Sequence, residues 1–242
     1  MALVVDGLKN QQVKSLLLFL NCGGKFTKIK PSLMPVIKTL TNRSNTTVYV
    51  WQITESEAWL RSGIELSQNS VNRLITMSSE MHRRGFLSIR HLLLAAGYSD
   101  NDLYYDDLGK PHLTDDKYIS ITHSYELTAI IISDDSTGID IEKRREKIKR
   151  IAVKFVNYED KFVAAQDNKI SALTVIWGAK ESMYKCLSQK GLGFFDHCKV
   201  EPFDLNSGTT ISRIDYNEIQ RSFDTYFEEI LEYTLVYILP VT

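Results

Sequence analysis

The composition of this 242-residue chain excludes several kinds of protein. Its formal net charge is −1, so the overall charge favours neither nucleic acid nor a membrane surface. No run of residues reaches the roughly 18 apolar positions of a membrane-spanning helix. Apolar residues make up 43% of the chain, which is enough to bury one large core or two small ones. We expect a protein that binds neither nucleic acid nor a membrane.

The cysteines point to a reducing compartment. Cys22, Cys186 and Cys198 are odd in number and lack the spacing of metal ligands. A disulfide framework or a zinc site is therefore not expected, and a cytoplasmic location fits.

In chain order, the first predicted elements are an apolar strand over residues 47–53 and a long helix over 78–96. Gly97 follows the helix, in the position where glycine commonly ends one. The next motif, Gly109-Lys110-Pro111, breaks any regular element because glycine is permissive and proline fixes φ. Lys110 is thus presented on a rigid turn, which suits a phosphate better than a core.

A half-buried strand is predicted over residues 119–124, where apolar and polar residues alternate. It delivers Thr122, His123 and Ser124 at its end, a common place for ligand contacts. A lone histidine there is more often structural. Because it comes just after Gly-Lys-Pro, we interpret His123 as a hydrogen-bond donor to phosphate.

The strand that follows a glycine at residue 138 carries two carboxylates at alternate positions. Asp140 and Glu142 share one face of this strand, while Ile139 and Ile141 face the core. Such a pair is more often simply a solvated face. The wider second half is predicted as strands 119–124, 127–133 and 137–142, helices 148–156, 158–166 and 170–189, and strands 199–202, 209–214 and 233–239.

The helix predicted over 170–189 contains the run from Trp177 to Lys185. Glu181 and Lys185 are one turn apart and share a face, although such pairs are usually surface pairs worth about 0.3–0.5 kcal/mol. Together with Asp140 and Glu142, they place three carboxylates and a lysine where one cation and one polyphosphate can be held.

These motifs, in this order, resemble the 4′-phosphopantetheinyl transferases, specifically the long, single-chain, surfactin-synthetase-activating type. The resemblance covers about residue 47 to the end and is carried by the segments 84–90, 109–111, 121–124, 138–142, 177–185 and 191–194. Two residues depart from the family pattern. Gly178 replaces a usual Ser, Thr or Cys, and Thr122 replaces a common Ser.

The resemblance implies transfer of phosphopantetheine from coenzyme A to a serine of an apo acyl or peptidyl carrier protein, with release of 3′,5′-ADP. It implies that Asp140, Glu142 and Glu181 bind Mg²⁺ or Mn²⁺, which hard oxygen ligands suit. Glu181 is the candidate base, Lys185 the contact to the pyrophosphate, and Asp140 the third catalytic residue. The implied coenzyme A contacts are Arg84, Arg90, Lys110, Pro111, Thr122, His123, Ser124 and Lys185.

The two arginines of the predicted helix carry different expectations. Arg84 is the candidate for the 3′-phosphate of the nucleotide, because a guanidinium suits bidentate phosphate contact. Arg90, six residues on, is either a second contact or an internal structural charge. Arg73 and Arg83 are expected to face solvent.

The resemblance also implies an α+β fold of two similar α/β subdomains in a pseudo-two-fold arrangement, with the active site in the cleft between them. We expect subdomains at 34–115 and 116–242, the second carrying the metal site, and an active monomer. Residues 1–33 are then an N-terminal extension. Their short apolar run at 16–20 is a poor signal peptide. An open alternative is that translation starts naturally at Met34 and that residues 1–33 come from an upstream start codon chosen in error.

The basic run from Lys143 to Arg150 has two interpretations. It is either a solvated helix start or a docking surface for an acidic carrier protein, where electrostatics set mainly the association rate. A nucleic-acid patch is disfavoured, because no aromatic residues are interleaved. The alternative to an enzyme is a non-catalytic module that binds coenzyme A or a carrier protein.

Overall fold

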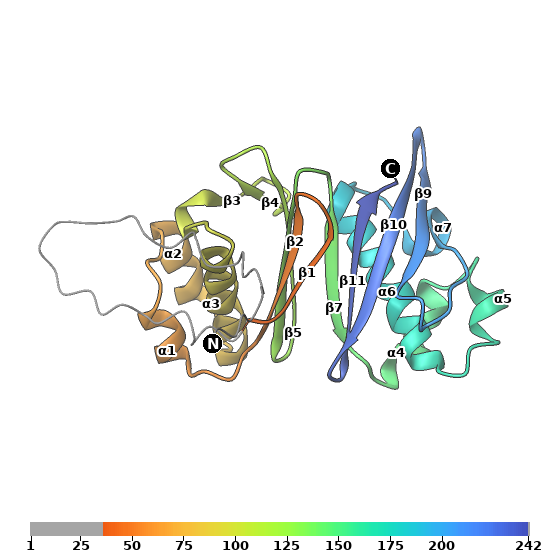
Figure 1. The fold of residues 1–242 in the computed structure, drawn as a ribbon, viewed down its shortest axis with the longest axis horizontal. Coiled ribbons are helices and arrows are strands. Elements are labelled where there is room, and N and C mark those ends of the chain that lie inside the picture. The colour runs from red at the N-terminus through yellow and green to blue at the C-terminus, as the bar shows by residue number, and fades with distance from the viewer. Residues whose placement is uncertain (1–35, 242) are drawn as a thin grey trace, which may run out of the picture. The chain divides into compact units, whose positions relative to one another are not determined.

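The computed structural model describes residues 36–241, which form two antiparallel sheets with helices on their outer sides (Figure 1). The first sheet has the order β1-β2-β6-β5 and the second the order β7-β11-β10-β9-β8. Their strands are β1 (Val36–Arg43), β2 (Thr46–Gln52), β5 (Tyr118–Ser124), β6 (Leu127–Ser133), β7 (Gly138–Lys143), β8 (Cys198–Val200), β9 (Thr209–Tyr216), β10 (Ile219–Ile230) and β11 (Tyr233–Pro240). A small hairpin pairs β3 (Leu103–Tyr105) with β4 (Pro111–Leu113).

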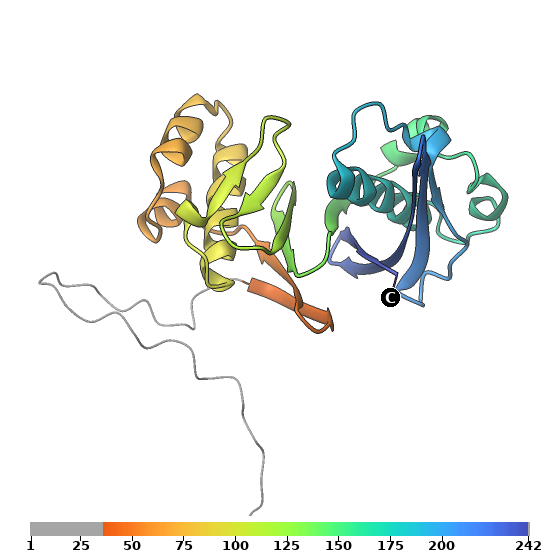
Figure 2. The same cartoon turned by 90° about the horizontal axis from the view of Figure 1, so that it is seen from above.

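The helices fall into two groups, one beside each sheet (Figures 1 and 2). They are α1 (Glu57–Ser62), α2 (Gln68–Thr76), α3 (Glu80–Ala95), α4 (Lys147–Ile151), α5 (Asp160–Val163), α6 (Lys169–Leu187) and α7 (Phe194–His197), with single 3₁₀ turns at Asp100–Asp102 and Ala152–Lys154. None of these helices has the length and apolar character that crossing a membrane requires.

The hydrophobic core has layers that follow from the alternation of side chains along the strands. One face of the first sheet packs on α3, where Trp51 and Ile130 meet Leu87. Its other face packs on the second sheet, where Val48 and Ile131 share one cluster with a set of residues from β7 and β11. That set is Ile139, Ile141, Leu235, Tyr237 and Leu239. The result is a helix–sheet–sheet–helix arrangement, because α6 covers the far face of the second sheet.

Several predicted elements are confirmed closely. The long helix α3 ends with Ala96 as its C-cap, and Gly97 takes φ of +90°, which a glycine adopts without steric cost. The strands at 119–124 and 127–133 are β5 and β6, and the long helix of the second half is α6. The mixed α/β fold class is therefore as expected.

The division of the chain between the sheets differs from the predicted boundary at residues 115 and 116. Strands β5 and β6 pair with β2 in the first sheet, so the change of sheet falls between Ser133 and Gly138. The reason is pairing: β6 is flanked on both sides, by β2 and β5, before the chain crosses to β7. The predicted extension at residues 1–33 lies outside the described residues.

Gly138 is held so closely against α6 that no side chain fits. A Cβ built at this position would lie 1.9 Å from the carbonyl oxygen of Ser182. We expect Gly138→Ala to lower the free energy of unfolding by at least about 2 kcal/mol, because backbone must move to admit the methyl group. Chemical denaturation measures this. The matched control is Gly85→Ala in α3, where the new Cβ makes only ordinary contact, 3.5 Å from His123 Cδ2. This substitution should raise the free energy of unfolding by about 0.5–1 kcal/mol, because alanine has the higher helix propensity. Equal effects of the two substitutions would contradict this account of Gly138.

Candidate active site

The candidate site lies where β5, β7 and α6 meet, so the first sheet and the second half of the chain both contribute to it. Asp140 and Glu142 come from β7 and, as predicted, share the face opposite Ile139 and Ile141. Glu181 and Lys185 come from α6, which packs on β7. The C-terminal end of β5 supplies Thr122, His123 and Ser124.

The hydroxyl groups of β5 hold the two carboxylates of β7. Thr122 Oγ1 donates to Asp140 Oδ1 at 3.2 Å and accepts from the backbone nitrogen of Ile141 at 3.1 Å. Ser124 Oγ donates to Glu142 Oε2 at 3.2 Å. Thr122 and Ser124 are both buried. Their hydroxyl groups bond to carboxylates, whereas the resemblance implied contacts to coenzyme A. These contacts orient the acidic pair.

Lys185 neutralises part of this acidic group. Its Nζ lies 2.8 Å from Asp140 Oδ1 and donates to the carbonyl oxygen of Ile139 at 2.9 Å. The side chain keeps 28% of its exposure, which leaves the ammonium group open to a ligand on one side. Lys185 therefore joins α6 to β7 and carries positive charge at the edge of the site.

Two of the carboxylates have raised pKa values. Burial, followed by the neighbouring charge of Asp140, raises the pKa of Glu181 to about 7. Burial and Asp140 also raise the pKa of Glu142 above its usual range. The three acidic groups thus interact, and a carboxyl with a pKa near 7 is suited to take up a proton at neutral pH.

The acidic group fits a divalent cation by its chemistry, although residues 36–241 contain no preassembled cage of three or more His, Cys, Asp or Glu side chains. Asp140 Oδ2 is buried and has no hydrogen-bonding partner among the described residues. A buried, unpaired carboxylate oxygen is costly unless a partner arrives. Asp140, Glu142 and Glu181 offer hard oxygen ligands of the kind that Mg²⁺ prefers.

Gly178 has a steric explanation in this structure. A Cβ at this position would lie 2.6 Å from Val236 Cγ2 and 3.7 Å from Asp140 Oδ2. The side chain of Val236 on β11 fills the space that a larger residue at 178 would need. The departure from the family pattern therefore accompanies close packing of α6 on β11, and it leaves Asp140 Oδ2 without a neighbouring hydroxyl.

His123 lies at the outer end of the site and has a second histidine beside it. The ring of His82, from the first turn of α3, meets the ring of His123 edge-on, with centroids 6.2 Å apart. Burial, then the positive fields of His82 and Lys185, lower the pKa of His123. His82 was not predicted from the sequence, because its contact with His123 depends on how α3 packs against β5. His82 lies one turn before Gly85, whose Cβ would contact His123.

Lys110 is presented on a rigid turn, as predicted. Gly109 takes φ of +80°, and Asp106 Oδ1 accepts from the backbone nitrogens of Leu108 and Lys110. Pro111 begins β4. Lys110 Nζ donates to the carbonyl oxygen of Cys186 at 2.5 Å, near the C-terminal end of α6. This bond links the β3–β4 hairpin to the helix that carries Glu181 and Lys185.

Arg90 lies away from the site, in the core of the first half. It is 3% exposed, and its Nε donates to Asp100 Oδ1 at 2.9 Å. Nη2 donates to Ser70 Oγ at 3.1 Å, and the guanidinium lies over the ring of Phe86. Of the two alternatives for Arg90, the structure favours an internal structural charge over a ligand contact.

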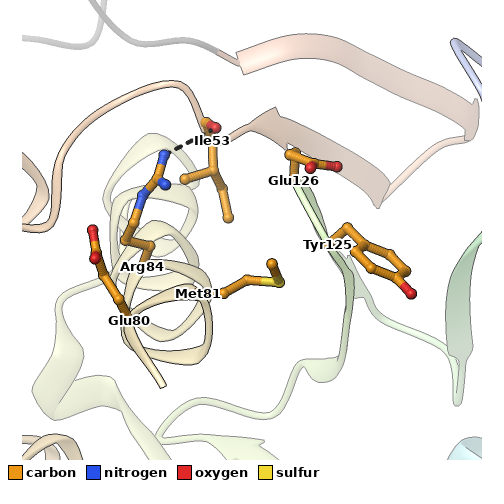
Figure 3. A pocket seen from close by; sticks show the side chains of 6 residues that line it. All are labelled: Ile53, Glu80, Met81, Arg84, Tyr125 and Glu126. Atoms are coloured by element: carbon orange, nitrogen blue, oxygen red, sulfur yellow. Dashed lines mark hydrogen bonds between the residues drawn. The ribbon is translucent and has the colours of Figure 1, made fainter. Parts of the chain in front are cut away.

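Arg84 lines a separate pocket of about 250 Å³ between α3 and the β5–β6 turn (Figure 3). Its Nη2 donates to the carbonyl oxygen of Ile53 at 3.3 Å, and its Nε is buried without a partner among the described residues. The other lining residues are Glu80, Met81, Tyr125 and Glu126. Two carboxylates line the same pocket as this guanidinium, so the surroundings of Arg84 are less favourable for a phosphate than its sequence context suggested.

Fold and site together define an α+β protein with a carboxylate–lysine centre bordered by histidine and lysine side chains. Residues 136–236 match the family model of the 4′-phosphopantetheinyl transferase superfamily. The chain is also similar to the 4′-phosphopantetheinyl transferase gsp of Aneurinibacillus migulanus, with 32% identity over 131 residues. This alignment covers 52% of the chain and 53% of that protein, so the chain spans about half the length of the relative it matches. Both comparisons support the suspected family, and the match to the superfamily model covers the part of the chain that carries Asp140, Glu181 and Lys185.

Proposed function

We propose that this protein transfers the 4′-phosphopantetheine arm of coenzyme A to a serine hydroxyl of an apo carrier protein, releasing 3′,5′-ADP. The observation that carries the proposal is the convergence of Asp140, Glu142, Glu181 and Lys185 on one site within the segment that matches the superfamily. The similarity to the gsp protein, which is named a 4′-phosphopantetheinyl transferase, supports the proposal.

The residues fit the charge changes of this reaction. Attack of a serine oxygen on the β-phosphorus forms a new P–O bond and breaks the bond to the 3′,5′-ADP oxygen, so negative charge builds up on the leaving group. Lys185 is the group placed to offset that charge. The attacking serine must lose its proton, and Glu181, with a pKa of about 7, is the proposed acceptor. His123 and Lys110 are proposed to bind phosphate oxygens.

A divalent cation is proposed as part of this site, held by Asp140, Glu142 and Glu181. When bound, Mg²⁺ or Mn²⁺ would neutralise charge on the pyrophosphate and help to position it. The buried, unpaired Asp140 Oδ2 supports this proposal, because a cation would supply the partner that this oxygen lacks. Lys185 and Thr122 both contact Oδ1, so they leave Oδ2 for the cation.

The carrier protein is proposed to dock beside Glu142, on the basic run from Lys143 to Arg150. Lys147, Lys149 and Arg150 are exposed in and after the first turn of α4. Arg144 is different, because its guanidinium donates to the carbonyl oxygens of Leu231 and Tyr233 in the β10–β11 turn. Arg144 is therefore structural, and the exposed members of the run are the ones available to an acidic partner.

The double substitution Lys147→Glu/Arg150→Glu tests this surface. We expect a several-fold higher KM for the carrier protein, a weaker dependence on salt, and an unchanged Kd for coenzyme A, since rim charges act mainly on association. The matched control is Lys161→Glu/Lys199→Glu, which makes the same charge change at exposed positions outside the run. If both pairs raise the KM equally, only net charge matters and the docking surface is refuted.

Chromatographic detection of 3′,5′-ADP tests the function as a whole. Incubation with coenzyme A, Mg²⁺ and an apo carrier protein should release it, and omission of the carrier protein or addition of a chelator should stop the release. Binding of coenzyme A without any release, across fatty-acid, polyketide and peptide-synthetase carriers, would instead support the non-catalytic binding module.

A further inference from the structure

We propose that Lys180 and Glu159 are positioning residues. This buried ion pair holds the segment that carries the basic run against α6, and so fixes where the acceptor serine of the carrier protein meets Glu181. The inference rests on the proposed function, because it takes a carrier protein as the partner. Both side chains are 0% exposed, so they act through the segments that they hold and not by contact with a ligand.

The pair bonds to backbone groups from several separate segments. Lys180 Nζ lies 2.8 Å from Glu159 Oε1, and each of the two side chains also has two backbone partners. Lys180 donates to carbonyl oxygens of the loop before α5 and of α7, and Glu159 accepts from backbone nitrogens of that loop and of β8. The four partners are the carbonyl oxygens of Phe155 (2.6 Å) and Phe194 (3.1 Å) and the backbone nitrogens of Asn157 (3.3 Å) and Val200 (2.9 Å).

An ion pair in this position contributes geometry more than stability. Burial removes the water from both charges, and their mutual attraction often only offsets that cost, so well-packed apolar residues of similar volume can stabilise a fold equally well. Apolar side chains cannot bond to four backbone groups. The pair of Lys180 and Glu159 therefore sets the distances between the segments that it joins.

The segment that carries the basic run is held at its two ends. At the end next to β7, Arg144 donates to the carbonyl oxygens of Leu231 and Tyr233. At the far end, Lys180 donates to the carbonyl oxygen of Phe155. Between these anchors, no residue of α4 or of the following 3₁₀ turn is buried. The two anchors therefore determine where the exposed basic side chains between them lie.

The far anchor is built next to the proposed proton acceptor, because Lys180 directly precedes Glu181 in α6. Trp177, one turn before Glu181, is flanked by the rings of Phe155 and Phe194, with centroids 5.1 Å and 5.5 Å away. These are the two residues whose carbonyl oxygens Lys180 holds. Trp177 also lines a cavity of about 110 Å³ together with residues of the basic run. A shift of the anchor would thus move the docking surface relative to the base.

Steady-state kinetics of Lys180→Met/Glu159→Gln test the proposal on the full chain. This double substitution removes both charges and keeps a side-chain oxygen for the backbone nitrogens. We expect kcat for transfer to fall about tenfold or more, the size that a misplacement below about 1 Å produces, with an unchanged Kd for coenzyme A. Exposed charges at Lys147 and Arg150 should act on the KM instead. Amide hydrogen exchange should become faster over residues 152–158 and stay unchanged in β10.

The matched control is Arg90→Met/Asp100→Asn, which removes the charges of a second buried ion pair, away from the site. This variant should also unfold at a lower urea concentration than the wild type, but its kcat should be unchanged. All rates are measured where circular dichroism shows the variants to be folded. If both double variants lower kcat equally, a general loss of stability explains the effect and the inference is wrong.

The remaining outcomes separate this inference from the function on which it rests. If the wild type transfers phosphopantetheine and Lys180→Met/Glu159→Gln has the same kcat, the inference is wrong and the proposed function stands. If the wild type binds coenzyme A and modifies no carrier protein, the proposed function itself fails. Should the double variant not fold, Glu159→Gln replaces it, because this change keeps the bonds of Lys180 to the two carbonyl oxygens. It should lower kcat by a smaller factor, and a kcat equal to that of the wild type would refute the inference.

Discussion

Replacing Glu181 by glutamine is expected to lower kcat for phosphopantetheine transfer by about 10²–10⁴-fold, because the serine then lacks its proton acceptor. The structure adds a second expectation. Burial and the charges of Asp140 and Glu142 disfavour the ionised form of Glu181, so a neutral amide should not lower the free energy of unfolding. Activity is therefore expected to fall while stability holds.

The measurement combines steady-state kinetics with chemical denaturation of the same preparation. Glu146→Gln is the control, because it removes an exposed carboxylate at the start of α4. It should leave kcat within about twofold of the wild type, because Glu146 is not one of the site carboxylates, and it should leave the free energy of unfolding nearly unchanged, as surface substitutions generally do. A kcat for Glu181→Gln within tenfold of the wild type would remove Glu181 from the catalytic role.

The second large effect is expected at Arg90. Substitution by leucine leaves Asp100 as a buried, uncompensated carboxylate, and breaking a buried ion pair from one side costs about 3–5 kcal/mol. Asp100 also accepts from the backbone nitrogen of Ser67, at the start of α2, and from Ser70 Oγ. The loss should therefore loosen α2 as well as α3.

Urea denaturation followed by tryptophan fluorescence measures this loss. Arg73→Leu is the matched control, because Arg73 is exposed and its guanidinium lies 5.8 Å from the centre of the same Phe86 ring. We expect less than about 1 kcal/mol there. A stable Arg90→Leu protein with weakened coenzyme A binding would reverse the assignment and restore Arg90 as a ligand contact.

Sequence periodicity predicted the elements whose side chains alternate cleanly. Strand β6 is buried along its whole length because both faces of the first sheet are covered, and β7 alternates between core isoleucines and site carboxylates. Strand β10 was not predicted, although it is the longest strand among the described residues. Its inward residues Phe223 and Phe227 are separated by acidic and polar positions that lower the apparent strand propensity.

The helices α1 and α2 were also missed, since residues 54–76 read as a polar stretch. Each of these short helices is anchored by few side chains. In α1 only Leu60 is buried, and in α2 only Ser70 and Leu74 are. Tertiary contact, rather than a strong local pattern, stabilises such short segments.

The candidate site could be predicted where the chemistry depends on spacing within one element. Asp140 with Glu142 and Glu181 with Lys185 needed only the periods of a strand and a helix. Contacts between different elements could not be predicted from the sequence. The bond from Lys110 to Cys186, the internal pairing of Arg90 and the His82–His123 pair all depend on how α3, the β3–β4 hairpin and α6 are packed.

The most direct measurement is the intact mass of an apo carrier protein after incubation with this protein, coenzyme A and Mg²⁺. We expect a mass gain equal to one phosphopantetheine arm. A carrier protein whose acceptor serine is replaced by alanine should show no gain, and neither should the wild-type carrier with Glu181→Gln over the same time. An unmodified carrier protein in the presence of demonstrably bound coenzyme A would contradict the account.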